Sequence, residues 1–202
     1  MPLSPEDRAH LDRLRASVAQ HTADFLGYPV AKDFDYAELL PFLQYPLNNL
    51  GDPFADSTWK VATREFEREV VAFVADLLRA PAGQWWGYVT NGGSEGNLYG
   101  LYLARELYPK GVVYYSQDTH YSVSKNLHFL GLRSIMIRSQ PHGEIDYDDL
   151  HATMRIHRDA PPIMFANIGT TMTEARDDVR RIRAIISDLA LPQSYVHADA
   201  AL

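Results

Sequence analysis

Short apolar runs alternate with helical patterns from about residue 85 to the end of the chain, and this alternation restricts the fold more than any other feature. Repeats of strand and helix require crossover connections, which produce a largely parallel sheet. Such a sheet is covered by helices on both faces, and no helical pattern follows the last run. We therefore expect the sequence to form part of a larger domain. The expected strands are 85–90, 111–116, 134–139, 161–169 and 195–202.

The sequence before this region indicates helices and turns. Ser4 precedes a proline, and apolar residues then recur at helical spacing, which predicts a capped N-terminal helix. The stretch from about Tyr28 to Pro53 is rich in Tyr, Pro and Asn, which disfavours long regular elements. Apolar residues three and four positions apart predict another helix within 58–78. We expect an N-terminal arm over 1–57 and the main domain over 58–202.

Composition excludes several classes of function. The 202 residues carry a net charge of -7, so no basic surplus exists to neutralise nucleic-acid phosphates. The chain has no cysteine, which excludes disulfides, thiolate metal ligands and cysteine nucleophiles. The polar N-terminus lacks the apolar segment of a signal peptide, and no apolar run approaches the roughly 18 residues of a membrane span. We expect a soluble cytoplasmic protein that binds neither nucleic acid nor membrane.

The segment Thr90–Asn97, with the sequence TNGGSEGN, is a candidate phosphate-binding turn. Its glycine pair follows an expected strand and lets the backbone approach a ligand closely. Ser94 and Glu95 then open a helix, whose free N–H groups and positive dipole end suit an anion. The spacing matches neither a dinucleotide-binding turn nor a P-loop. The alternative is a tight turn in which Ser94 caps the helix.

Two further candidates follow expected strands. His120 comes soon after the strand 111–116, at the sheet edge where ligands bind in open parallel sheets. Its imidazole could stack on a flat ring or transfer a proton; the alternative is a surface histidine in a loop. Thr170 and Thr171 follow the strand 161–169 and could donate hydroxyl hydrogen bonds, or they could form an ordinary turn.

Asp199 lies in the last apolar run, where a carboxylate is costly unless it is paired. A protonated pyridine nitrogen is one possible partner, and enzymes that use pyridoxal 5'-phosphate (PLP) employ an aspartate for it. His197 lies on the same strand face and offers an internal pair instead. A His-x-Asp metal site is a further reading, but no third ligand is placed nearby, so we expect no metal.

These motifs resemble, in their order, those of the group II PLP-dependent amino-acid decarboxylases, which have fold type I, the aspartate-aminotransferase-like fold. The sequence is most similar to bacterial PLP-dependent histidine decarboxylases and also resembles plant serine decarboxylases. The resemblance implies an α/β fold: a truncated large domain with an N-terminal helical arm. The matching segments lie between about Leu26 and Leu202 and comprise GYP (27–29), DFDY (33–36), NNLGDPF (48–54), WGYVTNGGSEGN (86–97), THYSV (119–123), GEIDYDDL (143–150), ANIGTT (166–171) and HADAAL (197–202).

The resemblance implies PLP as the cofactor and assigns residues to it. His120 is implied to stack on the pyridine ring, and Ala201 to pack on the other face of the ring. Asp199 is implied to pair with the pyridinium nitrogen, and Thr171 to lie near the 3'-oxygen or the phosphate. His120 and Asp199 would be the catalytic residues. The phosphate would be cradled by Gly92, Gly93 and Ser94.

The same resemblance implies decarboxylation of an amino acid, L-histidine to histamine, with serine decarboxylation to ethanolamine as the alternative. Enzymes of this fold form homodimers, so a second copy of the chain is the implied partner. The segment that would face the substrate contains Tyr45, Asn48 and Asn49.

One departure concerns the lysine that holds the cofactor. In the family it lies in a Ser-x-His-Lys motif downstream of HADAA, and no lysine of this chain lies in such a motif. We therefore expect these 202 residues to be a fragment or truncated product that turns over inefficiently, or a non-catalytic dimerisation module. The lysines are Lys32, Lys60, Lys110 and Lys125.

Overall fold

The computed structural model describes residues 3–23, 25 and 35–201. The matched segment at 27–29, the first two residues of the segment at 33–36, and Leu202 lie outside the described residues. The chain divides into two compact units, Met1–Arg64 and Glu65–Leu202, which are described separately here.

The first unit is mostly helical and exposed. The helix α1 (Pro5–Ala23) begins after Ser4, whose hydroxyl accepts a hydrogen bond from the Asp7 N–H at 3.0 Å. The cap at Ser4 confirms the sequence prediction, and the Ser4 hydroxyl also donates to the Asp7 carboxylate at 2.6 Å, so that the two residues cap the helix reciprocally. A 3-10 helix, η1 (Ala37–Gln44), is the regular element that the structure describes within the proline-rich stretch.

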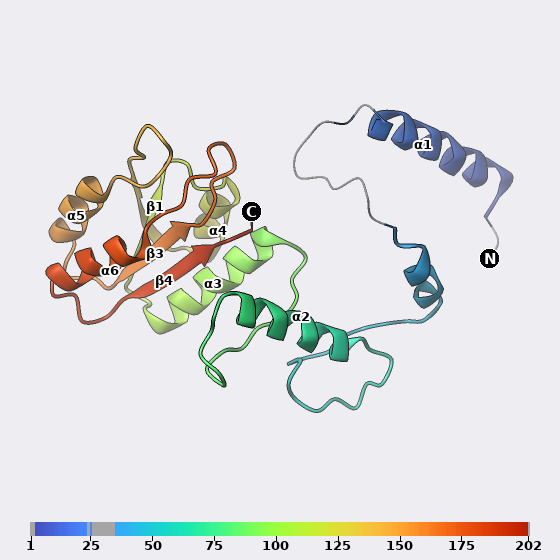
Figure 1. Ribbon diagram of the computed structural model, residues 1–202, viewed down its shortest axis with the longest axis horizontal. Helices are drawn as coiled ribbons and strands as arrows, with labels where there is room; N and C mark the ends of the chain where they lie inside the picture. Colours follow the sequence, from blue (N-terminus) through green and yellow to red (C-terminus); the bar gives the residue numbers. More distant parts are fainter. Residues whose placement is uncertain (1–2, 24, 26–34, 202) are drawn as a thin grey trace. The chain divides into compact units, whose positions relative to one another are not determined.

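The second unit is built on a parallel four-stranded sheet with the order β2-β1-β3-β4 (Figure 1). All strand pairs are parallel, which confirms the predicted α/β fold. The strands are β1 (Val112–Ser116), β2 (Arg133–Ile137), β3 (Pro162–Asn167) and β4 (Tyr195–Asp199). The helices are α2 (Arg64–Leu77), α3 (Gly93–Leu107), α4 (Ser122–Leu130), α5 (Tyr147–Ile156) and α6 (Val179–Asp188).

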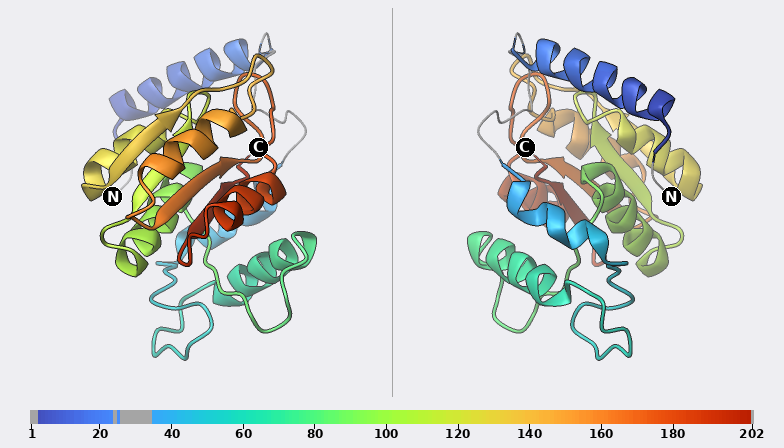
Figure 2. Two further views of the ribbon diagram at one scale, coloured as in Figure 1. Left: turned by 90° about the vertical axis from the view of Figure 1, so that its left-hand side faces the viewer. Right: turned by 90° about the vertical axis from the view of Figure 1, so that its right-hand side faces the viewer.

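Helices cover both faces of the sheet, and the central strand β3 is buried along its whole length. Its side chains alternate: Phe165 packs with α3 and α4, and Met164 with α5 and α6. The left view of Figure 2 faces the layer of α5 and α6. Full burial of each such side chain contributes about 1.5–3 kcal/mol. The packing of these side chains on the two sides of the sheet therefore fixes which face of each strand meets which pair of helices.

The predicted strand 85–90 is wrong, because the structure gives this segment no strand conformation. A strand needs a neighbour to complete its hydrogen bonds, and none of the described strands pairs with it. The segment lies against α2 instead: the Val89 N–H donates to the Glu67 carboxylate at 3.1 Å. Gly87 faces Val71, where an added methyl group would lie 3.2 Å from a Val71 methyl carbon. The glycine turn thus follows an extended segment rather than a strand.

Candidate cofactor site

The glycine turn begins helix α3. Gly92 has φ 131°, a conformation that glycine adopts far more readily than other residues, and it directly precedes the helix. The Glu95 carboxylate accepts a hydrogen bond from the Asn91 N–H at 2.8 Å and fixes the turn. Ser94 lies inside the helix, so the alternative of Ser94 as the cap is wrong. The N–H groups of a first turn have no acceptor within the helix, so those of Gly93 and Ser94 can bind an anion.

His120 lies between β1 and α4, at the carboxyl edge of the sheet. Its Nδ1 accepts a hydrogen bond from the Ser122 N–H at 3.3 Å and lies 2.7 Å from the Ser122 hydroxyl. The neutral ring therefore carries its proton on Nε2. Asn126, further along α4, donates to the Ser94 carbonyl at 3.0 Å and ties this helix to the glycine turn.

After the end of β3, the side chain of Thr170 forms hydrogen bonds within the turn. The Thr170 hydroxyl lies 2.7 Å from that of Thr173 and accepts from the Ala175 N–H at 3.0 Å. Thr170 is therefore part of the turn, as one reading of the sequence proposed. Thr171 is exposed beside it, and its place near the cofactor stays a prediction.

The end of β4 lies against α3. Asp199 Oδ2 accepts a hydrogen bond from Asn97 Nδ2 at 2.8 Å, and Asp199 Oδ1 accepts from the Ala201 N–H at 3.2 Å. An added methyl group on Gly93 would lie 3.0 Å from the Ala201 methyl group. Asn97, which binds the carboxylate, is one helical turn after Gly93, about 5–6 Å along the helix axis. The structure thus brings Gly93, Asp199 and Ala201 together.

His197 is joined to Asp199 through a third residue. Its Nε2 lies 2.8 Å from Asn97 Oδ1, so the asparagine amide connects the imidazole and the carboxylate. Burial lowers the pKa of His197 below its ordinary 6.5, and the nearby charge of Asp199 opposes this effect. The sequence analysis placed His197 and Asp199 on one strand face, which is confirmed. The direct pair that it offered as an alternative is wrong, because Asn97 lies between the two side chains.

Two residues that contact the candidate site were not predicted from the sequence. Asn97 is buried on α3, and Gly100 one turn further on lies under the His197 ring. One feature of the sequence could have indicated that Asn97 is buried. It lies four positions before Leu101, so the two residues share a helix face, and Leu101 is buried. Tyr45, Asn48 and Asn49 lie in the first unit, and their contact with a substrate stays a prediction. In the structure the Asn49 side chain accepts from the Thr63 N–H at 2.8 Å.

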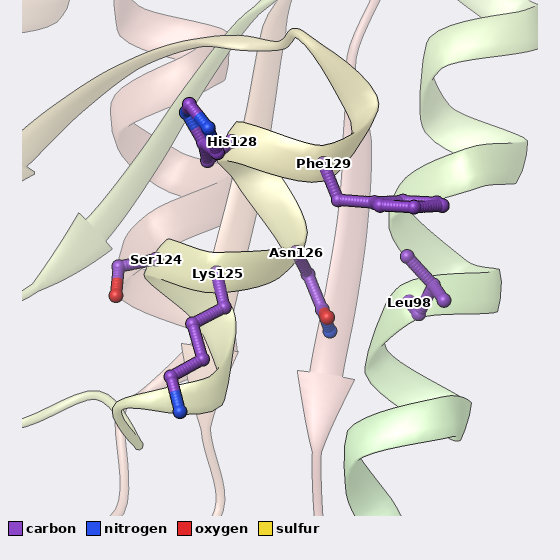
Figure 3. A pocket seen from close by; sticks show the side chains of 6 residues that line it. All are labelled: Leu98, Ser124, Lys125, Asn126, His128 and Phe129. Carbon is purple, nitrogen blue, oxygen red and sulfur yellow. The ribbon is translucent and has the colours of Figure 1, made fainter.

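The structure has an open hollow of about 570 Å³ on the outer side of α3 and α4. Phe129 of α4 points toward Leu98 of α3 in this hollow (Figure 3). None of the predicted cofactor residues lines it. Its lining consists of Leu98, Ser124, Lys125, Asn126, His128 and Phe129.

Within the described part of the chain, no helix combines the length and the hydrophobicity of a membrane span. The same residues contain no group of three or more His, Asp or Glu side chains arranged to hold a metal ion.

Solved structures resemble this chain closely. L-methionine decarboxylase from Streptomyces sp. 590 superposes with a TM-score of 0.87 at 25% identity, over 99% of this chain and 55% of that chain. Sphingosine-1-phosphate lyase from Burkholderia pseudomallei K96243 superposes with a TM-score of 0.68 at 16% identity, over 98% of this chain and 47% of that chain, and shows the fold alone. The chain has part of the large domain of the fold type I PLP-dependent enzymes.

The family follows from the sequence comparison. Residues 53–202 match the pyridoxal-dependent decarboxylase conserved domain, and the chain belongs to this family. It is 54% identical over 200 residues to the histidine decarboxylase of Mesorhizobium japonicum, covering 99% of this chain and 54% of the relative. It is 45% identical to that of Morganella morganii, covering 100% of this chain and 54% of the relative. The chain spans about half the length of these curated relatives.

Proposed function

We propose that the gene product containing this sequence is a PLP-dependent decarboxylase of L-histidine. The observation that carries the proposal is the Asp199 carboxylate, held by a neutral amide one helical turn from the exposed start of α3. A cationic ring with an anionic substituent needs a carboxylate and an anion-binding turn at this kind of spacing. No ion pair among the described residues involves Asp199, so its charge is available.

Each residue has a separate task in this proposal. Asp199 pairs with the pyridinium nitrogen, and His120 stacks on the ring, whose other face packs on Ala201. Thr171 contributes a hydroxyl near the 3'-oxygen or the phosphate. Bound PLP supplies an electron sink for the bond to the departing carboxylate. The phosphate lies on the N–H groups and hydroxyl of Gly92, Gly93 and Ser94.

The substrate proposal rests on the relatives that are histidine decarboxylases at 44–54% identity. We propose that Tyr45, Asn48 and Asn49 face the amino acid. Serine is the alternative substrate.

We also propose that the protein is cytoplasmic and forms a homodimer. The dimer is supported by the apolar side chains of α1, because Leu11, Leu14 and Val18 are 51–56% exposed and a second copy would cover them. Sedimentation velocity of the gene product tests the dimer, and a monomer at all concentrations would contradict it.

The test of function is a spectroscopic titration of the gene product with PLP, followed by carbon dioxide release from carboxyl-labelled L-histidine and L-serine. We expect a saturable absorbance change and faster release from histidine. Faster release from serine would reject the histidine assignment. Saturable binding without release from either amino acid would reject the decarboxylase activity. A protein that does not bind PLP would favour the non-catalytic dimerisation module.

A further inference from the structure

We infer that Asn97 and His197 are positioning residues that hold the Asp199 side chain in one orientation through uncharged hydrogen-bonding groups, so that a cationic ring can pair with it. This inference rests on the proposed function and extends it to residues that do not touch the cofactor. It starts from one chain of contacts: His197 Nε2 to Asn97 Oδ1 at 2.8 Å, and Asn97 Nδ2 to Asp199 Oδ2 at 2.8 Å.

The direction of each hydrogen bond follows from the chemistry of the groups. An ionised carboxylate only accepts, so the Asn97 nitrogen must face Asp199. The Asn97 oxygen then faces His197 and must accept, which requires the proton of the neutral imidazole on Nε2. One tautomer of His197 therefore fixes one orientation of the amide, and the amide fixes Asp199. If the imidazole proton lay on Nδ1 instead, His197 Nε2 and Asn97 Oδ1 would both be acceptors, and this contact would no longer be a hydrogen bond.

The packing around His197 holds the imidazole in this place. Gly100 lies directly beneath the ring, and a methyl group added there would overlap His197 Nδ1 and Cε1. The ring also lies 4.9 Å from the Phe165 ring of the neighbouring strand, centroid to centroid. Because glycine has no side chain, position 100 leaves room for the imidazole to reach the buried Asn97.

The charges along this chain of contacts explain the choice of residues. A carboxylate beside apolar strands needs hydrogen-bond donors, and Asp199 receives hydrogen bonds from the Asn97 amide and the Ala201 N–H. A direct histidinium partner would supply a donor but would also cancel the charge. The amide of Asn97 donates without carrying charge, and burial favours the neutral form of His197. Among the described residues Asp199 is therefore held without a cationic partner, which leaves it free to pair with a cation that arrives from outside.

The test uses Asn97→Leu, which keeps the volume and removes both hydrogen bonds, and His197→Phe, which keeps a ring and removes the donor. We expect Asn97→Leu to raise the Kd for PLP by about 10- to 100-fold, the size expected for a lost hydrogen bond to a charged group. His197→Phe should raise it less, by about 3- to 10-fold. Because His197 acts only through Asn97, adding His197→Phe to Asn97→Leu should change the Kd by less than about twofold.

Matched controls separate positioning from general destabilisation. His128→Phe replaces an exposed histidine of α4, and Asn167→Leu removes a buried amide that bonds Ser116, Thr119 and Asp177 instead of Asp199. In the background of either control variant, His197→Phe should still raise the Kd by the same factor as in the wild-type protein. Fully additive effects of Asn97→Leu and His197→Phe would overturn the inference, and so would a Kd unchanged by Asn97→Leu.

A second measurement needs no cofactor. Nitrogen NMR of histidine-labelled protein, with the His197 signal assigned by its loss in His197→Phe, should show a neutral ring protonated on Nε2. A ring protonated on Nδ1 would overturn the inference even if Asn97→Leu does not fold. If the wild-type protein fails to bind PLP, the proposed function falls, while this spectrum still decides whether the hydrogen-bonded chain exists.

Discussion

Gly93 and Ala201 lie so close that a methyl group added to the glycine would be 3.0 Å from the alanine methyl carbon. This relationship joins the turn that begins α3 to the residue after β4, over a separation of more than a hundred positions. The proposed ring and phosphate of the cofactor would meet at this junction. Substitutions here should affect cofactor binding more than folding.

Gly93→Ala is expected to raise the Kd for PLP at least about fivefold, because relief of the close contact with Ala201 would displace the N–H groups of the turn, and a lost hydrogen bond to a charged group costs about 1.5–3 kcal/mol. The matched control is Gly96→Ala on the same helix, where the nearest atom to the added carbon is the Thr90 hydroxyl at 4.0 Å. Absorbance titration of both variants with PLP checks the expectation. Equal affinities for the two variants would contradict it.

Asp199→Asn is expected to raise the Kd for PLP at least about 30-fold, since losing one partner of the charge pair that the bound cofactor would form and cover costs roughly 2–5 kcal/mol. Asp188→Asn is the control, because Asp188 ends α6 and bonds His151 at the surface. The same titration measures both. Tight PLP binding by Asp199→Asn would remove the carboxylate from the proposed site.

Gly100→Ala should lower the free energy of unfolding by about 1–3 kcal/mol, because the new methyl group overlaps the His197 ring. The higher helix propensity of alanine offsets about 0.5–1 kcal/mol of this loss. Gly96→Ala receives the same gain without the overlap and should be stabilising. Urea denaturation of the two variants compares them directly. A stabilised Gly100→Ala protein would contradict the close packing of His197.

His197 should make stability depend on pH. Burial lowers the pKa of its imidazole in the folded state below the ordinary 6.5, so the unfolded chain binds the proton more readily. Its contribution to stability is full above 6.5 and falls as the pH drops through the lower folded pKa. His197→Phe should therefore lose less stability than wild type on acidification, and His128→Phe should follow wild type. Urea denaturation at a series of pH values provides the comparison, and parallel curves for wild type and His197→Phe would reject it.

Asp177 should show the opposite sign. Its carboxylate is buried and accepts hydrogen bonds from the Asn167 N–H at 2.7 Å and the Ile145 N–H at 2.8 Å. Burial raises its pKa above the ordinary 3.8 despite these bonds. Stability from this group is full below 3.8 and falls as the pH rises through the folded pKa.

Asp177→Asn removes this titration and turns an amide nitrogen toward a backbone N–H, which costs about 1–3 kcal/mol. The stability difference from wild type should be largest in acid and shrink as the pH rises. Denaturant unfolding at acidic and neutral pH measures this difference. A difference that grows toward neutral pH would mean that the hydrogen bonds outweigh burial.

Periodicity predicted most of the fold but not its polar contacts. Apolar runs located β1 to β4, and the parallel topology then placed His120 and Asp199 at one edge of the sheet. The segment 85–90 was misread because an apolar run shows that residues are suited to a strand, and not that a neighbour exists to pair with them. Asn97 was missed for a related reason. Its bond to Asp199 joins positions 102 apart, and spacing along one helix says nothing about its partner on a distant strand.

The register of β3 against β4 pairs Phe165 with His197 and Asn167 with Asp199. Side chains alternate between the two faces of a strand, so a shift of β4 by one residue would exchange its faces. Asp199 would then point toward the layer of α5 and α6, and the uncharged Ala198 would face α3. The orientation of the carboxylate therefore depends on apolar residues such as Met164 and Phe165, which are buried on the two faces of the sheet. A core substitution that shifts the β3–β4 register would therefore disrupt the site, although every polar residue of the site remains in the sequence.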